Sequence, residues 1–357
     1  MRTPATVSLV RHLVLTHGWN ATSYQILNPG IAWWINPGDD AVIGFVRAAG
    51  VRVVAGAPVC PPDLLATVVE RFRQDATSQG ESVCFFGAGE RLERLLLPTG
   101  AWSVASLGAQ PSWNPALWAA ILVERASLRK QLHRATNKGV TVVEWATVTV
   151  EKESRLRECL GQWLEGRHLP ALHFLVEPET LDNLADRRLF VAERESDVVG
   201  FLVASPVSAR NGWLIEQIIR GHGAVNGVTE LLVDACMRAL ATDGASYVTL
   251  GLAPLSRHST FDSARMPWWL RLTLRLVRAH GRRFYNFEGL DTFKAKFEPE
   301  HWEEISAVAN ASRFPPRALW AIAAAFANGS PLGLVLRAVG RGVAQEARWL
   351  RRRARGI

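Results

Sequence analysis

The sequence predicts an α/β (α+β) fold in which one structural unit occurs twice. The chain has 357 residues, of which 48% are hydrophobic and 21% are charged. This composition is typical of a folded globular protein, and the length is sufficient for two domains of ordinary size. Residues 31–87 and 188–252 carry the same order of three strand-like segments, one helical segment and a further strand-like segment. We therefore expect two halves that are built alike.

The first unit begins with short segments rich in β-branched residues that are separated by turn signals. Alternation of apolar and polar residues predicts the strands, and Asn36-Pro37-Gly38-Asp39 predicts the first turn. We expect strands at Ile31–Ile35, Ala41–Val46, Val51–Val59 and Val83–Gly87, and a helix over Pro61–Ser78.

The second unit repeats this order after a connecting segment. We expect strands at Arg188–Glu193, Val198–Ser205, Trp213–Arg220 and Tyr247–Gly251, and a helix over Gly227–Thr242. Helical spacing in Pro115–Lys138 predicts that this segment joins the halves. Two β-β-β-α-β units indicate a duplicated acetyltransferase-like fold.

The positive charge of the chain is concentrated at its C-terminal end. Residues 311–357 contain nine arginines and one acid, Glu346, and so carry +8, which equals the formal net charge of the whole chain. We expect this segment to form a basic helical tail. Such a tail attracts the phosphates of nucleic acid or of anionic lipid, and charge alone does not separate the two.

Several classes of site are not indicated. The four cysteines have no metal-ligand spacing and lie in apolar surroundings, so we expect reduced, buried thiols. The nine histidines are dispersed, and we expect no metal. There is no run of eighteen apolar residues and no signal-peptide pattern at the N-terminus, so we expect no membrane-spanning segment.

The segment most informative about function is Tyr285–Trp302, with the sequence Y-N-F-E-G-L-D-T-F-K-A-K-F-E-P-E-H-W. Upstream, Leu250–Ser256 (L-G-L-A-P-L-S) leaves a predicted strand, and Asn226-Gly227 opens a predicted helix that carries Glu230. The segment at 128–135 reads L-R-K-Q-L-H-R-A. In this order the motifs resemble the cytoplasmic C-terminal domain of the phosphatidylglycerol lysyltransferases of the multiple peptide resistance factor type, which move an amino acid from aminoacyl-tRNA to a lipid hydroxyl.

The resemblance implies a tandem GCN5-related acetyltransferase-like (dual GNAT) fold. We expect an N-terminal domain over residues 1–125, a connecting helix over 126–139, a catalytic domain over 140–310 and the tail over 311–357. The large membrane-embedded half that usually accompanies this domain is absent from the sequence, so we expect no lipid-flipping role. The protein is expected to be cytoplasmic and peripheral on the inner face of the cell membrane, with its oligomeric state open.

The resemblance also implies a set of site residues. An aminoacyl ester is already activated, so the enzyme must grip the donor's ammonium group, stabilise an oxyanion and manage one proton. No cofactor is expected, and aminoacyl-tRNA is the co-substrate. The candidate catalytic residues are Glu216, Arg220, Glu230 and Lys294. The candidate substrate-binding residues are Arg129, Gln217, Asn226, Gly227, Gly251, Ser256, Tyr285, Asn286 and Lys296.

One of these positions departs from the family pattern. The family has an aspartate three residues before the arginine that matches Arg220, and Gln217 occupies this place, with Glu216 one residue earlier. A shift of one residue in a strand turns the side chain to the other face. Either a bulge returns Glu216 to the site, or the amino group is recognised in another way. We expect Lys294 and Lys296 to contact a substrate anion.

Two other functions are compatible with the residues. The Gly-rich loop Arg220–Gly227 is the place where a coenzyme A-dependent N-acyltransferase would hold a pyrophosphate, although Val225 interrupts the usual pattern. A non-catalytic module that binds anionic lipid or RNA is the third possibility. Trp268-Trp269 open a segment with Arg271, Arg275, Arg278 and Arg282 at helical spacing. It could lie on an anionic bilayer, bind a tRNA backbone or simply pack on the protein.

Overall fold

The computed structural model describes residues 2–166, 174–175, 180–259, 266–280 and 287–327. In these residues twelve strands form one mixed sheet. The strands are β1 (Ala32–Ile35), β2 (Val42–Ala48), β3 (Val51–Ala55), β4 (Ser82–Ala88), β5 (Ser103–Trp113), β6 (Val140–Glu144), β7 (Arg188–Arg194), β8 (Asp197–Val207), β9 (Gly212–Arg220), β10 (Tyr247–Thr249), β11 (Ala253–Pro254) and β12 (His301–Ala309).

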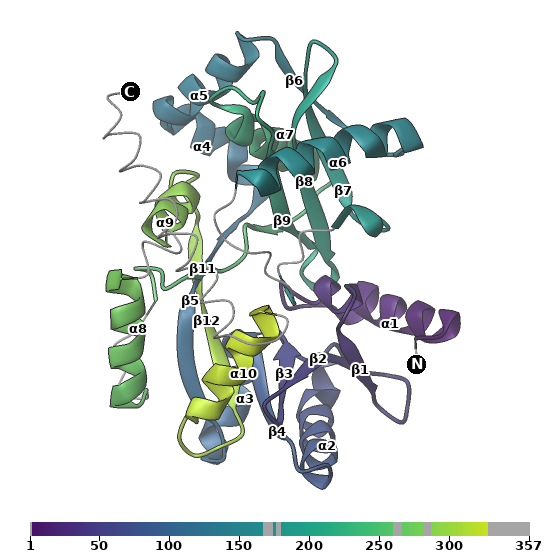
Figure 1. The fold of residues 1–357 in the computed structure, drawn as a ribbon, viewed down its shortest axis with the longest axis vertical. Coiled ribbons are helices and arrows are strands. Elements are labelled where there is room, and N and C mark those ends of the chain that lie inside the picture. Colours follow the sequence, from purple (N-terminus) through teal and green to yellow (C-terminus); the bar gives the residue numbers. More distant parts are fainter. Residues whose placement is uncertain (1, 167–173, 176–179, 260–265, 281–286, 328–357) are drawn as a thin grey trace, which may run out of the picture.

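Helices lie on both faces of this sheet (Figure 1). They are α1 (Pro4–His17), α2 (Leu65–Ser78), α3 (Glu90–Leu96), α4 (Trp118–Glu124), α5 (Ala126–Thr136), α6 (Val150–Glu165), α7 (Val228–Thr242), α8 (Trp268–His280), α9 (Phe287–Ala295) and α10 (Pro316–Ala327). The short 3₁₀ turns include η1 (Tyr24–Leu27), η5 (Thr180–Asp182) and η6 (Ser208–Arg210). No helix of the described residues is both long enough and apolar enough to cross a bilayer.

The predicted duplication is confirmed by the strand pairing. In the first half β2 pairs antiparallel with β3, and β3 pairs parallel with β4 through α2. In the second half β8 pairs antiparallel with β9, and β9 pairs parallel with β10 through α7. The strand β1 lies beside β2 as β7 lies beside β8. The predicted helices and strands are present with end shifts of a few residues, and the joining segment is two helices that meet at Arg125.

The two halves are joined by an exchange of strands. Strand β5 follows β4 in the chain but pairs with β10 of the second half. Strand β12 follows β10 in the chain but pairs with β4 of the first half. The two exchanged strands then pair antiparallel with each other, from His301 opposite Ser112 to Ala309 opposite Ser103. Figure 1 shows them side by side between the halves, so the sheet is continuous. The domain boundaries stay a prediction.

From Val199 onward strand β8 is buried on both faces, which explains the apolar run Val198–Ala204. Phe201 and Val203 belong to the apolar cluster that includes residues of α6. Leu202 and Ala204 belong to the cluster that includes residues of α7. Successive side chains of a strand point to opposite faces, so α6 and α7 cover the two sides of the second half. All four cysteines are buried and free, as predicted.

The start of α7 depends on a glycine. Gly227 has a φ of +100° and precedes the helix, and a Cβ placed there would lie 2.1 Å from the carbonyl oxygen of Gln131 in α5. Gly244, just after the same helix, has a φ of +73°, and a Cβ there would meet no atom within 4 Å. An alanine at either position would therefore be strained by the positive φ. Only at Gly227 would its Cβ also clash with neighbouring atoms.

We expect Gly227→Ala to lower the free energy of unfolding by about 2 kcal/mol more than Gly244→Ala, because only the first adds a steric clash to the φ strain. Urea unfolding of the two variants measures the difference. Equal losses in the two variants would show that α5 does not approach α7 this closely.

Candidate active site where strands β9 and β10 separate

Strands β9 and β10 pair over only three residues and then separate. Tyr247–Thr249 pair with Gly212–Leu214. The chain then turns at Gly251, which has a φ of +69°, and enters β11, which pairs with β5. Strand β9 continues along β8 as far as Arg220. Side chains of β9 after Leu214 and the backbone around Gly251 therefore border the place where the sheet opens.

A β-bulge lies at this place. Gln217 is opposite Val203 and Ile215 is opposite Ala204, so Glu216 has no partner of its own on β8. In a bulge two consecutive residues oppose one residue of the neighbouring strand, which changes the direction of their side chains. Of the two possibilities left open by the sequence, the bulge is therefore present. It lies in the strand at Glu216.

The Glu216 carboxylate is held by a buried arginine. Arg187 Nε donates to Glu216 Oε2 and Arg187 Nη2 to Glu216 Oε1, both at 3.0 Å. The side chains of Arg187 and Glu216 are 0% and 5% exposed. Arg187 Nη2 also donates to Asn28 Oδ1 at 3.0 Å, and the guanidinium lies over the ring of Tyr24. A buried ion pair is stable only when its remaining hydrogen-bond donors also have partners. Here the two bonds from Arg187 fix the position of the Glu216 carboxylate.

The first half of the chain supplies the other wall of this region. The segment around η1 brings Gln25, whose Nε2 donates to Ser205 Oγ of β8 at 3.0 Å, and Asn28. Within the described part of the chain, Gln25 Oε1, Asn28 Nδ2 and Ser23 Oγ are buried and have no hydrogen-bond partner. Unpaired buried polar atoms are rare in folded proteins. The segment that contacts Arg187 thus offers three unpaired groups to a substrate: an acceptor on Gln25, a donor on Asn28 and the hydroxyl group of Ser23.

Lys294 of α9 lies in the interior, at 5% exposure. Its Nζ donates to the carbonyl oxygens of Leu250, Gly251 and Leu252 at 2.7, 2.7 and 2.9 Å. Burial lowers the pKa of Lys294 to about 7, and the nearby Asp291 acts in the opposite direction. All three N–H groups of the ammonium are used in holding the turn after β10. A substrate anion could bind Lys294 only by displacing a carbonyl group, and the predicted contact stays a prediction.

Ser256 and Asp291 form a second link between this turn and α9. Ser256 Oγ donates to Asp291 Oδ1 at 2.5 Å, and the same hydroxyl accepts from the amide of His258. Both side chains are buried. The candidates Gly251, Ser256 and Lys294 therefore lie together, and their hydrogen bonds are with the backbone and with the side chains of Thr249 and Asp291.

Lys296 and Glu230 are brought together as an ion pair, with Nζ 2.7 Å from Oε1. The ammonium also lies over the ring of Phe293 at 3.9 Å. The Lys296 side chain is partly exposed, whereas Glu230 on α7 is more covered. These two predicted residues thus neutralise each other in this structure.

Arg220 and Asn226 close the loop between β9 and α7. Arg220 Nη2 donates to Ala224 O at 3.0 Å and to Asn226 Oδ1 at 3.3 Å. The amides of Gly221, His222 and Ala224 donate to Val199 O, Gln162 Oε1 and Gly221 O. Three amides of the Gly-rich loop are therefore engaged inside the protein, and α5 covers the start of α7 at Gly227.

Arg129 lies apart from these groups. Arg129 donates to the carbonyl oxygens of Leu122 and Val123 and so caps the end of α4. Tyr285 and Asn286 lie outside the described residues, as do residues 328–357 of the tail. Arg187, Gln25 and Asn28 were not among the residues predicted from the sequence. No local pattern identifies them, because Asn28 and Arg187 are 159 residues apart and meet only in the folded protein.

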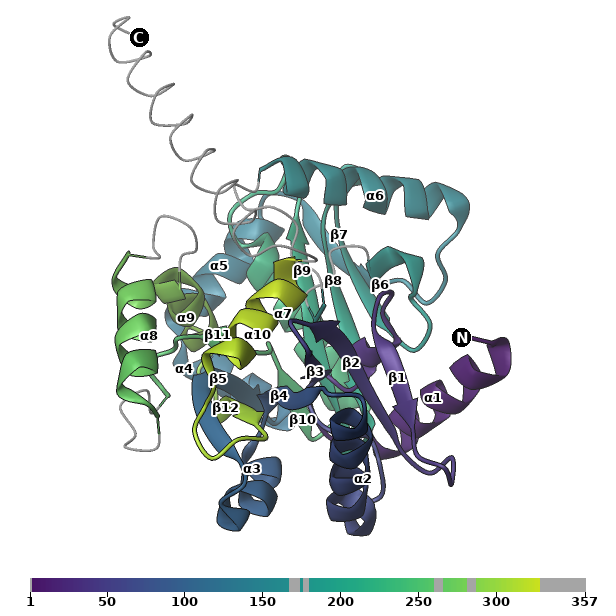
Figure 2. The ribbon, with the colours of Figure 1, turned by 60° about the horizontal axis from the view of Figure 1, so that its bottom comes forward.

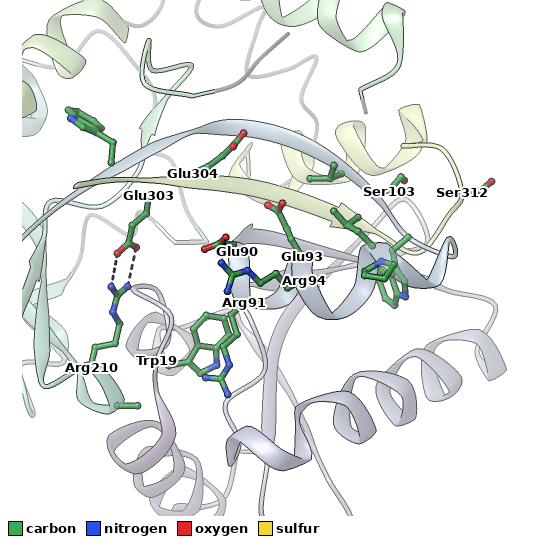
Figure 3. A pocket seen from close by; sticks show the side chains of 17 residues that line it. Trp19, Glu90, Arg91, Glu93, Arg94, Ser103, Arg210, Glu303, Glu304 and Ser312 are labelled. Atoms are coloured by element: carbon green, nitrogen blue, oxygen red, sulfur yellow. Dashed lines mark hydrogen bonds and ion pairs between the residues drawn. The ribbon is translucent and has the colours of Figure 1, made fainter. Parts of the chain in front are cut away.

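A separate cleft of about 1360 Å³ lies beside β12 (Figure 3). Glu303 points toward Arg210, which it binds through both oxygens at 2.6 and 3.0 Å, and Arg210 lies over the ring of Tyr247. Glu304 points to the other side of the strand. The lining includes Trp19, Arg91, Arg94 and Trp302, and none of the predicted site residues. This cleft is therefore distinct from the region around Glu216.

We expect Lys294→Met to lower the free energy of unfolding by about 3 kcal/mol or more, because three carbonyl groups lose their donor. Lys296→Met is the matched control. It removes a partly exposed ion pair and should cost about 1 kcal/mol or less. Urea unfolding at pH 7 compares the two, and losses of equal size would contradict the role of Lys294 as the clamp of this turn.

The effect of Lys294 on stability should depend on pH. Its pKa is lowered to about 7 in the folded protein, whereas the unfolded chain keeps this proton up to about pH 10.4. Between these two pH values Lys294 is protonated in the unfolded state but not in the folded state. The contribution of Lys294 to the free energy of unfolding therefore rises with pH. The stability difference between wild type and Lys294→Met should thus be larger at pH 9 than at pH 6, and a constant difference would contradict the lowered pKa.

Comparison with known proteins agrees with this fold. The family model described as phosphatidylglycerol lysyltransferase, C-terminal, matches residues 11–309. The phosphatidylglycerol lysyltransferase of Bacillus subtilis (strain 168) is 22% identical over 286 residues, which are 79% of this chain and 33% of that protein. The chain thus spans about a third of the length of this relative.

Two solved structures share the fold. The C-terminal domain of a putative lysylphosphatidylglycerol synthetase from Agrobacterium fabrum superposes with a TM-score of 0.75 at 20% identity, covering 90% of this chain and 97% of that one. The L-PGS structure from Bacillus licheniformis gives a TM-score of 0.74 at 20% identity, with 94% and 96% covered. The predicted tandem fold is confirmed, and the chain belongs to the family of phosphatidylglycerol lysyltransferase C-terminal domains.

Proposed function

We propose that this chain is an aminoacyltransferase that moves an amino acid from aminoacyl-tRNA onto a hydroxyl group of phosphatidylglycerol. The observation that carries the proposal is the family match over residues 11–309, which includes both halves and the exchanged strands that join them. The donor is a soluble tRNA and the acceptor is a membrane lipid. The reaction would therefore take place at the inner face of the cell membrane, with the protein bound there peripherally.

The proposed reaction exchanges one ester for another. The lipid hydroxyl oxygen attacks the carbonyl carbon of the aminoacyl ester, and a new C–O bond forms as the bond to the tRNA ribose oxygen breaks. The proton of the lipid hydroxyl ends on the ribose oxygen. Because the donor ester is already activated, the protein has to bind and orient the two substrates and stabilise the charge that develops on the carbonyl oxygen.

The region around the bulge has the groups that such a donor requires. Glu216, fixed by Arg187, and the unpaired Oε1 of Gln25 are acceptors for the ammonium group of the amino acid. The unpaired Nδ2 of Asn28 is a donor for the ester carbonyl oxygen. A carboxylate that accepts two bonds from arginine retains lone pairs for a further donor. We assign the aminoacyl group to this region.

The alternative use of coenzyme A receives less support. A pyrophosphate at the start of α7 would need free amides in the Gly-rich loop. The amides of Gly221, His222 and Ala224 already have partners, and the Gln131 carbonyl of α5 approaches Gly227. The partial negative charge of the Gln131 carbonyl oxygen beside Gly227 would repel a pyrophosphate at the start of α7. Aminoacyl-tRNA is therefore the donor that we propose.

The donor can be tested with purified protein. Label from charged tRNA should appear in a chloroform-soluble product when phosphatidylglycerol is present and coenzyme A is absent. Omission of the lipid is the control and should leave the label in the aqueous phase. Transfer that depends on an acyl-coenzyme A and ignores charged tRNA would replace the proposal with the N-acyltransferase function.

The position of the aminoacyl group can be tested with Asn28→Asp. This change keeps the oxygen that accepts from Arg187 and replaces the Nδ2 donor with a second oxygen. We expect transfer to fall by roughly 10²-fold, which is the usual effect of removing one hydrogen-bond donor to a developing oxyanion. Asn114→Asp is the control, because its Oδ1 contact with the amide of Ala116 is retained. Undiminished transfer by folded Asn28→Asp protein would place the carbonyl oxygen elsewhere.

A further inference from the structure

Helix α8 has one face buried in the protein and another in solvent. Leu270 is fully buried, and Trp269 and Leu274 pack against the same apolar cluster. On the other side Trp268 and Leu272 are 71% and 51% exposed. Residues four apart are neighbours on a helix surface, so these two large apolar side chains form one exposed patch. Burying Leu270 is sufficient to explain why the helix packs, but it does not explain this patch.

The charge on α8 has a single sign. The helix contains Arg271, Arg275 and Arg278 and no acidic residue. Arg271 and Arg275 lie within one turn of Leu272, and Arg275 is exposed. An apolar patch with arginines beside it has the composition of a helix that lies in the interface of an anionic bilayer, with tryptophan at the level of the headgroups.

We propose that the exposed face of α8, defined by Trp268, Arg271, Leu272 and Arg275, is the surface through which this protein binds an anionic lipid bilayer. The inference rests on the proposed function, because an enzyme that acts on a membrane lipid must reach the membrane surface. Arginines alone would also suit an RNA backbone. The exposed leucine and tryptophan favour lipid, since a phosphate backbone gives an aliphatic side chain no apolar environment.

The position of α8 fits this role. Figures 1 and 2 both show α8 at the outer side of the molecule, near α9, while α6 lies far from it. Helix α9 carries Lys294, which holds the turn after β10. Docking through α8 would therefore bring the lipid surface to the side of the molecule that carries α9. Helix α6 also exposes an apolar residue, Val150, at 86%, but acids follow it at Glu151 and Glu153.

A fluorescent probe at Leu272→Cys tests the proposal directly. The four native cysteines are buried, and burial raises the pKa of Cys60 to about 11 and that of Cys84 to about 12. An environment-sensitive thiol reagent at neutral pH should therefore label the introduced cysteine. Val150→Cys on α6 is the matched control. The labelled full chains are mixed with phosphatidylglycerol vesicles, with phosphatidylcholine vesicles or, in a separate sample without lipid, with uncharged tRNA.

We expect a blue shift at position 272 with phosphatidylglycerol vesicles, quenching by spin-labelled lipid, and no change at position 150. Replacing Arg271 and Arg275 with Gln should weaken vesicle binding by about ten-fold or more, and added salt should weaken binding of the wild type. The probe reports the location of α8 itself, so the arginines after residue 310 do not affect its interpretation.

Three results would overturn the proposal: no binding to the anionic vesicles, binding without a change at position 272, or a response of the 272 probe to tRNA in place of lipid. The last would assign the face to RNA. The assay contains no aminoacyl donor, so it succeeds or fails independently of the transfer reaction. A protein that binds vesicles through α8 but transfers nothing would contradict the proposed function and leave this inference standing.

Discussion

The antiparallel pairing of β5 with β12 is the constraint on which the rest of the structure depends. Strand β5 follows the strands of the first half in the chain but pairs with β10 of the second half. Strand β12 follows the strands of the second half but pairs with β4 of the first half. The two halves consequently form one sheet (Figure 2) and do not sit as separate sheets on a linker. This fixed relation allows Gln25 and Asn28 of the first half to reach β8 and Arg187 of the second half. The candidate site is therefore composed of residues from both halves.

The Arg187–Glu216 pair shows how a carboxyl group is accommodated in the interior at this site. Moving two charges out of water costs several kcal/mol for each ion, and the pair repays it only with good geometry and further hydrogen bonds. The guanidinium meets these conditions through Glu216, Asn28 and the backbone of Asn183. The bulge at Glu216 places the acid where Arg187 can bind it. Such a rigid, charged and buried arrangement suits recognition of an ammonium group better than it suits fold stability alone.

The sequence predicted the fold more completely than the site, for a physical reason. Alternation, turn residues and helical spacing are local, so both β-β-β-α-β units were visible in it. Hydrogen bonds between distant segments are not local, and Asn28, Gln25 and Arg187 had no pattern that could reveal them. The bulge at Glu216 was one of two possibilities, and only the register with β8 reveals that it is present. Lys294 was recognised as important, but its three carbonyl partners follow from the turn after β10 and not from the spacing of the lysines.

The central claim is that this chain, which spans about a third of the length of its Bacillus subtilis relative, modifies phosphatidylglycerol. Mass spectrometry of lipids from a host that expresses the chain, compared with the same host carrying an empty vector, tests it most directly. We predict a new species whose mass equals that of phosphatidylglycerol plus one aminoacyl residue, and the identity of that residue names the transferred amino acid. An unchanged lipid profile in cells that contain folded protein and charged tRNA would contradict the account.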